Sequence, residues 1–206
     1  VKDAKMSYHV QVESHMSLTG SNADNRILIK PSEMGAAIVA LYNEVASLTG
    51  GSKVSGPALP SEKAAKLKKV ASRLVKHSGQ ALVVSGSNNL GEQMLVNGLN
   101  AMLDSYGNTI DFANASMQRQ GSDKQIQNLV KEMNGGQVDA AFFLDGANPA
   151  WDLPNSATFV KGLGKVKLKV SFSGTPNETA LLCDYIAPTH HWLESWGDAE
   201  PKRGHY

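Results

Sequence analysis

A regular alternation of short apolar runs with amphipathic stretches is the feature that most constrains how this chain can fold. Residues 81–84 and 138–144 are apolar runs, and residues 166–172 alternate apolar with polar side chains, so all three predict β-strands. Residues 90–106 and 122–133 repeat apolar side chains with the period of an α-helix. Strands that alternate with helices through short loops imply crossover connections. The pattern therefore predicts an α/β fold, a doubly wound, mostly parallel sheet with helices on both faces.

Turn and capping residues mark further elements. The first third of the chain predicts two strands and two helices, at residues 8–12, 26–30, 32–49 and 61–78. Residues 109–112 predict another short strand, and residues 175–178 combine a proline with a capping box, which predicts the start of a helix. The strand at residues 166–172 has one polar face, which predicts a place near an edge of the sheet.

The length of 206 residues suits about one domain, so residues 1–206 are expected to form a single α/β domain. A neighbouring domain could share residues 1–31. Residues 50–60, which are rich in Gly, Ser and Pro, predict a flexible loop. Because the sequence has no initiator Met and stops in a polar, aromatic run, we expect a fragment of a longer polypeptide.

Charge, apolar content and cysteine usage exclude several classes of function. Twenty Lys and Arg against 19 Asp and Glu leave a net charge of +1, so no overall field attracts nucleic acid or acidic lipid. The longest apolar runs are far shorter than the about 20 residues that cross a bilayer, so no direct membrane insertion is expected. Cys183 is the only cysteine, which excludes an internal disulfide and an all-cysteine metal or iron–sulfur site within this chain. Its surroundings predict a buried small side chain rather than a reactive thiol.

Three turns follow predicted strands, at residues 85–88, 145–149 and 172–175. In an open parallel sheet, ligands bind beyond the carboxyl ends of the strands, and glycines there let the backbone approach a phosphate. The alternative is that these turns only connect strands to helices. Neither a Walker pattern nor Gly-x-Gly-x-x-Gly follows a strand, so the indication of a phosphate site is weak.

Two clusters of polar residues have competing interpretations. Six basic residues share the helix predicted at residues 61–78: Lys63, Lys66, Lys68, Lys69, Arg73 and Lys76. A solvated helix face is the favoured interpretation and a docking surface for an acidic partner the other, while the absence of interleaved aromatic residues argues against nucleic acid.

His190 and His191 stand near Glu194 and Asp198. These residues suggest either a metal site or, more simply, polar packing of a loop, and no metal site is predicted because adjacent histidines on a strand point to opposite faces. No catalytic triad is predicted either. Trp192 and Trp196 could anchor a contact with another domain.

An ordered set of short motifs resembles the molybdopterin oxidoreductase superfamily, which includes dimethyl sulfoxide reductase and formate dehydrogenase. The motifs are Gly-Ala-Asn-Pro at residues 146–149, Asn-Glu-Thr-Ala at 177–180, Cys-Asp at 183–184, Ile-Ala-Pro at 186–188 and Glu-Ser-Trp-Gly-Asp at 194–198. Further segments, at residues 12–14, 19–26, 31–33, 85–103 and 191–198, make the chain similar to the large iron–sulfur, molybdopterin-oxidoreductase-like subunit of alternative complex III, a quinol:electron-acceptor oxidoreductase of bacterial respiratory chains.

The resemblance implies a Rossmann-like layer that, in true molybdoenzymes, holds a guanine dinucleotide. Carried over by motif, the cofactor-binding residues would be Ser85, Gly86, Ser87, Asp145, Gly146, Asn148, Pro149, Glu178 and Thr179. The alternative complex III subunit lacks the molybdenum cofactor, so the resemblance implies no cofactor in this fragment, with iron–sulfur clusters elsewhere in the parent protein. It also implies that the partners are other domains and subunits of a membrane-bound respiratory complex, on the periplasmic side.

Three functions from different classes follow from these observations. The leading interpretation is a scaffold fragment of a respiratory oxidoreductase subunit, without a redox centre or catalytic residues of its own. The second is the molybdopterin guanine dinucleotide-binding domain of an active molybdoenzyme. The third is an independent nucleotide-binding or hydrolytic Rossmann-like protein.

Overall fold

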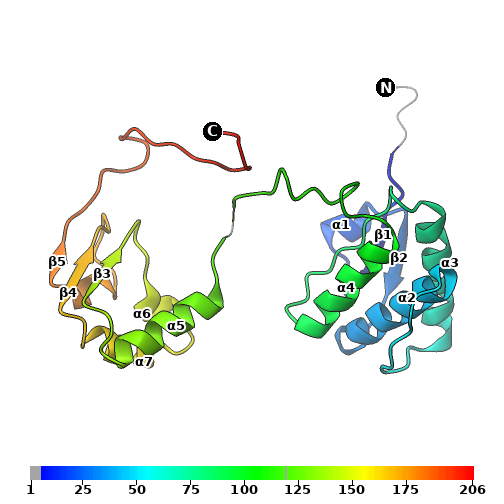
Figure 1. Cartoon of the computed structure of the whole chain (residues 1–206), viewed down its shortest axis with the longest axis horizontal. Coiled ribbons are helices and arrows are strands. Elements are labelled where there is room, and N and C mark those ends of the chain that lie inside the picture. The colour runs from blue at the N-terminus through cyan, green and yellow to red at the C-terminus, as the bar shows by residue number, and fades with distance from the viewer. Residues whose placement is uncertain (1–5, 119) are drawn as a thin grey trace. The chain divides into compact units, whose positions relative to one another are not determined.

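The computed structural model describes residues 6–118 and 120–206, and the chain divides into two compact units, Val1–Ala113 and Asn114–Tyr206. Each unit combines α-helices with parallel strands, so the predicted α/β class is confirmed (Figure 1). The single domain over residues 1–206, the sharing of residues 1–31 and the flexibility of residues 50–60 stay predictions. The first five of these residues lie outside the described ones.

The first unit begins with two parallel strands, β1 (Val10–Glu13) and β2 (Asn25–Leu28), joined through the short helix α1 (Leu18–Ser21). Val12 pairs with Ile27 in the ladder. Both strands lie within two residues of the positions that the apolar pattern predicts.

Three long helices complete this unit: α2 (Met34–Thr49), which follows the 3-10 turn η1 (Pro31–Glu33), α3 (Ser61–Lys76) and α4 (Leu90–Met102). Helix α2 packs against both α3 and α4. It ends at Gly50, whose φ of 79° is a left-handed conformation that glycine adopts without a Cβ clash. All three predicted helices are therefore present.

The apolar faces of these elements form two buried clusters. One joins the strands to α2 and α3 and consists of Ile27, Ile29, Ala37 and Leu67. The other lies among α2, α3 and α4 and consists of Val45, Ala71, Ala81, Leu99 and Leu103.

The prediction of a strand at residues 81–84 is wrong, because these residues form no strand in the described part of the chain. Asn100, which is buried on α4, donates from Nδ2 to the Val83 carbonyl at 2.8 Å and accepts from the Val83 N–H at 2.9 Å. One side-chain amide thus occupies both backbone groups that a neighbouring strand would use. Ser105 and Thr109 donate from their hydroxyls to the Ala81 carbonyl.

The strand predicted at residues 109–112 is also wrong. These residues form a turn with an isolated bridge between Tyr106 and Ile110. The N–H groups of Thr109 and Ile110 both donate to the Ser105 carbonyl, which is local pairing rather than a ladder.

An asparagine side chain also binds both backbone groups of one residue in the loop at residues 50–60, as Asn100 does for Val83. Asn43 on α2 donates from Nδ2 to the Val54 carbonyl and accepts from the Val54 N–H, both at 2.9 Å. The middle of this loop is therefore attached to α2 through one asparagine.

The second unit has the order helix, strand, helices, strand, strand. Its elements are α5 (Asp123–Asn134), β3 (Ala140–Phe143), α6 (Pro149–Asp152), α7 (Ser156–Leu163), β4 (Leu168–Ser171), the 3-10 turn η2 (Ala180–Leu182) and β5 (Tyr185–Ile186). The strands form a parallel sheet in the order β3-β4-β5. Ser122 caps α5 by accepting from the Gln125 N–H, as the sequence predicts.

Helices α5 and α7 pack together against one side of this sheet (Figure 1). The cluster between them consists of Met133, Phe143, Phe159, Leu163 and Val166. Phe159 is fully buried and meets Phe143 edge-on, with ring centroids 6.1 Å apart. The other side of the sheet carries Phe142, which is 58% exposed and stacks on Phe172.

Strand β4 is central rather than near an edge, which corrects the prediction from its polar face. Its alternating polar residues point toward the helices, where Ser171 and Ser173 are buried and Lys169 forms an ion pair with Asp184 at 3.0 Å. Leu168, on the apolar face, is 38% exposed. The side predicted to be wet is therefore the covered side, because hydrogen bonds and an ion pair satisfy its polar groups.

The helix predicted to start at residues 175–178 is present only as the 3-10 turn η2. The cap comes from Asn177 rather than from Thr175, the first residue of the predicted capping box, since Asn177 Oδ1 accepts from the Ala180 N–H at 2.8 Å. The chain then turns into β5 after three residues, too early for an α-helix to form.

Candidate functional site

The candidate site lies at the carboxyl end of β3, where the chain makes a tight turn. Asp145 and Gly146 both have positive φ, at 46° and 72°, and the Ala147 N–H donates to the Leu144 carbonyl at 2.9 Å. Two consecutive residues at positive φ are the pattern of a type I′ turn, for which Asp-Gly is a favoured pair. This turn directs the following residues toward the loop that leaves β4.

Asn148 joins the two loops. Its Oδ1 accepts from the N–H and the hydroxyl of Thr179, both at 3.0 Å, and its Nδ2 donates to Glu178 at 2.6 Å. Thr179 is fully buried, and its Oγ1 accepts in turn from the Ala150 N–H at the start of α6. We call Asn148, Glu178 and Thr179 the loop junction. The structure thus brings together residues that the resemblance implies, from segments about thirty positions apart in the sequence.

The loop junction has a negative charge. The hydrogen bond from Asn148 holds the pKa of Glu178 below its usual value, which keeps this carboxylate ionised near neutral pH. Pro149 stands at the first position of α6, where its missing N–H costs no hydrogen bond.

These contacts leave few groups for a dinucleotide. A pyrophosphate needs backbone N–H donors or cations directed at it. Here the polar atoms of Asn148 and Thr179 bond one another, and the N–H groups of Ala147 and Thr179 donate within the loops. Asp145 and Glu178 add two carboxylates to the same loops. The residues do not fit the guanine dinucleotide in this arrangement.

We expect Asn148→Ala to lower the free energy of unfolding by about 2 kcal/mol, because the buried N–H and hydroxyl of Thr179 both lose their acceptor. Urea unfolding of the full chain measures the loss, and the Thr179 amide should exchange its hydrogen faster. Asn155→Ala is the matched control, because the Asn155 side chain makes no capping bond at the start of α7. Equal stability of the two variants would contradict the role given to the loop junction.

The third predicted segment, Ser85, Gly86 and Ser87, belongs to the first unit. The Ser85 hydroxyl accepts from the Ser87 N–H, and Gln93 donates from Nε2 to the carbonyls of both serines, at 3.0 and 2.6 Å. Asn89 caps the following α4 by accepting from the Glu92 N–H. This turn is therefore closed by its own side chains and by α4.

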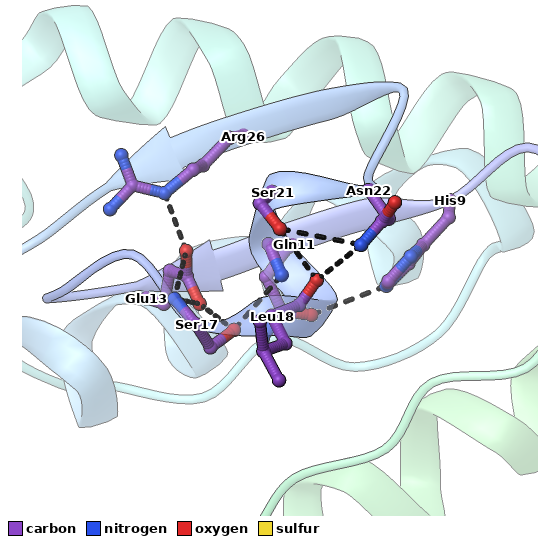
Figure 2. A network of polar contacts seen from close by, with 9 residues as sticks. His9, Gln11, Glu13, Ser17, Leu18, Ser21, Asn22 and Arg26 are labelled. Atoms are coloured by element: carbon purple, nitrogen blue, oxygen red, sulfur yellow. Dashed lines mark hydrogen bonds and ion pairs between the residues drawn. The ribbon is translucent and has the colours of Figure 1, made fainter.

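Figure 2 shows a polar network in the first unit that the sequence pattern does not predict, although Glu13 and Arg26 lie in segments that carry the resemblance. The buried carboxylate of Glu13 accepts from the Ser17 hydroxyl at 2.6 Å and from Arg26 Nε at 2.5 Å. A side chain at Gly20 would displace this carboxylate from its hydrogen bonds. The hydrogen bonds from Ser17 first, and then Arg26, lower the pKa of Glu13 to about 2. Such a weakly basic carboxylate joins β1, α1 and β2 and is a poor general base.

The Glu13 network predicts a specific loss of stability in acid. Because the folded pKa is about 2 and the ordinary value is 4.5, the contribution of Glu13 is complete above about pH 5 and is lost as the pH falls toward 2. Glu13→Gln should therefore be much less stable than the unchanged chain at pH 7 and nearly equal to it near pH 2. Urea unfolding across this pH range measures the difference.

Glu44→Gln is the control for this pH dependence, because the Glu44 carboxylate makes no hydrogen bond or ion pair within the described residues. Its stability should follow that of the unchanged chain at every pH. A Glu13→Gln variant that also follows the unchanged chain would contradict the network's contribution.

The remaining candidate residues do not converge on a centre. His190 and His191 are exposed, and among the described residues no three His, Cys, Asp or Glu side chains come together as metal ligands. Cys183 is half-buried against the core of the second unit, and burial raises the pKa of its thiol, which agrees with a small packing residue. Trp192 and Trp196 are 75% and 104% exposed. Over residues 6–118 and 120–206, no helix has both the length and the apolar character to cross a membrane.

Comparison with known proteins gives a short local similarity. No model of a known protein family matches the chain. Over 52 residues the chain is 40% identical to the menaquinone reductase, molybdopterin-binding-like subunit, of Nitratidesulfovibrio vulgaris Hildenborough. These residues make up 25% of this chain and 8% of that relative, so the chain spans less than a tenth of the relative's length. The match indicates a relation to molybdopterin oxidoreductase-type proteins over a quarter of the chain.

Proposed function

We propose that this chain is part of a respiratory oxidoreductase subunit of the molybdopterin oxidoreductase type, and that it serves there as a scaffold without a redox centre of its own. The finer assignment is to the large subunit of alternative complex III, on the segments at residues 12–14, 19–26, 31–33, 85–103 and 191–198. The parent protein would then work in a membrane-associated complex on the periplasmic side. The similarity to a menaquinone reductase subunit supports the respiratory part of this proposal.

The loop junction is the observation that supports a scaffold role for this chain. Asn148 and Thr179 stand where the resemblance implies nucleotide ligands, yet their polar atoms bond each other and hold the two loops together. The ionised Glu178 beside them would repel a phosphate. Residues used in this way stabilise the fold instead of holding a cofactor.

Calorimetry with GDP tests the scaffold proposal. We expect the 206-residue chain to bind GDP with a Kd above about 1 mM. A Kd of about 1 μM that is lost in Asn148→Ala would overturn the scaffold and support the second candidate, a guanine dinucleotide-binding domain. One observation favours that candidate: both loops meet at the carboxyl ends of parallel strands, where α/β sheets bind nucleotides.

The gene around this sequence tests the respiratory assignment separately. Continuation of the reading frame into runs of Cys-x2-Cys-x2-Cys supports it, because these residues ligate iron–sulfur clusters. A complete reading frame without any such run contradicts it, whatever the result with GDP.

A further inference from the structure

A basic groove lies in the first unit between β1 and the second half of α3. Its volume is about 470 Å³. It is lined by Tyr8, Val10, Asn25, Lys69, Val70, Ser72, Arg73, Lys76 and His77. Among the residues that the structure describes, the lining contains three permanent cations and no carboxylate. The carboxylate of Asp24, beside the lining residue Asn25, accepts from the backbone N–H of His9 at 2.7 Å.

Two of the other basic residues of α3 are paired with carboxylates, whereas Lys68, which is not among the lining residues, has no ion pair within the described residues either. Lys63 forms an ion pair with Glu33 at 2.5 Å, and Lys66 with Glu62 at 2.8 Å. No carboxylate of the described residues lies within ion-pair distance of the groove's cations, Lys69, Arg73 and Lys76. The three cations of the groove are therefore available to an acidic ligand.

The groove's cations form a column along one face of α3. Their spacing of i, i+4 and i+7 brings successive side chains about 5–6 Å apart, over about 10 Å of helix. The Arg73 guanidinium lies 3.5 Å from the centroid of the Tyr8 ring, a cation–π contact that holds it at the wall of the groove. The middle of the column is therefore already oriented.

We propose that this groove binds an extended acidic segment of a partner protein. In an extended chain, side chains at i and i+2 lie on the same side about 6.6 Å apart, close to the spacing of the column. Asn25, in the same lining, offers its side-chain amide to the backbone of such a segment, and the Ser72 hydroxyl, which donates to the Lys68 carbonyl, can accept a hydrogen bond from it. This inference does not depend on the respiratory assignment.

A compact phosphate is the less suitable ligand for this groove. Phosphates in helical proteins are favoured at helix N-termini, where free N–H groups and the positive end of the dipole face the anion. The groove contains the last turn of α3, with Lys76 and His77, and the free backbone groups at this end of a helix are carbonyls rather than N–H donors. Long cationic side chains that reach beyond this end suit carboxylates spread along a chain.

The experiment uses the whole 206-residue chain and an eight-residue peptide in which Glu alternates with Ser. Fluorescence anisotropy at low salt follows binding of the labelled peptide. The groove variant combines Lys69→Gln, Arg73→Gln and Lys76→Gln, and should bind at least about tenfold more weakly. The control variant removes the same charge from exposed lysines of the second unit through Lys124→Gln, Lys131→Gln and Lys161→Gln.

The control variant should keep its affinity within about twofold, and a peptide with Gln in place of Glu should not bind. Added salt should weaken binding to the unchanged chain much more than to the groove variant. Equal affinity of the groove and control variants overturns the proposal, as does absence of binding. The last measurement uses inorganic pyrophosphate as a competitor of the peptide. If pyrophosphate displaces the peptide at a concentration lower than the peptide needs for binding, the ligand is a phosphate and the proposal is wrong.

Discussion

Phe159→Ala should lower the free energy of unfolding of the second unit by about 3–5 kcal/mol, since it leaves a cavity at the centre of the unit's core. The side chain is fully buried on α7, and its edge contact with Phe143 ties this helix to β3. Hydrogen exchange at the amides of α5, β3 and α7 in the full chain measures the loss within this unit. Exchange should become faster in all three elements together.

Phe142→Ala is the control for this prediction, because Phe142 neighbours Phe143 in β3 but points to the other side of the sheet. It is 58% exposed and loses only its stacking on Phe172, so it should cost about 1 kcal/mol or less. Equal losses in the two variants would mean that the core of the unit is not between α5, α7 and the sheet.

The amphipathic period predicts α2, α3, α4 and α5 within a few residues of their observed bounds. Helix hydrogen bonds and the apolar stripe are both local, so the sequence carries most of the necessary information. The N-cap at Ser122 and the stop at Gly50 are local in the same way.

Whether a segment forms a strand depends on the neighbouring segment with which its backbone pairs, and the apolar pattern does not identify that segment. Residues 81–84 have the apolar composition of a strand, but the Asn100 side chain, 17 positions from Val83, takes the place of a neighbouring strand. For β4, the alternation predicts two faces but does not indicate which one the helices cover. The polar Ser171 is buried with its hydroxyl hydrogen-bonded, whereas the apolar Leu168 is 38% exposed. Periodicity cannot distinguish these cases.

The site was predictable only in part for a similar reason. Motifs single out Asn148, Glu178 and Thr179 separately, and the structure brings them into one hydrogen-bonded group. Whether their polar atoms face a ligand or each other depends on how two loops meet, which residue types alone do not decide. Glu13 and Arg26 lie in segments that carry the resemblance, but nothing in the sequence indicates their ion pair, because two residues 13 positions apart form no local pattern.

Asn100→Leu should lower the free energy of unfolding by about 2–4 kcal/mol. The substitution keeps the size of the side chain but leaves the N–H and the carbonyl of Val83 without their partner, and each unpaired backbone group costs about 1–3 kcal/mol when it is shielded from water. The same segment supplies Ala81 to the core with Leu99 and Leu103, so its release also exposes apolar surface. Urea unfolding measures the loss, and hydrogen exchange at the Val83 amide should become faster.

Asn97→Leu, one turn earlier on the exposed side of α4, separates this role from a general effect of leucine on the helix. It should change stability by less than about 0.5 kcal/mol, because the Asn97 side chain makes no hydrogen bond within the described residues. If Asn100→Leu behaved like this control, the extended segment at residues 81–84 would be held by its apolar side chains alone. The amide would then be dispensable, and the same conclusion would apply to Asn43 and Val54, which repeat the arrangement on α2.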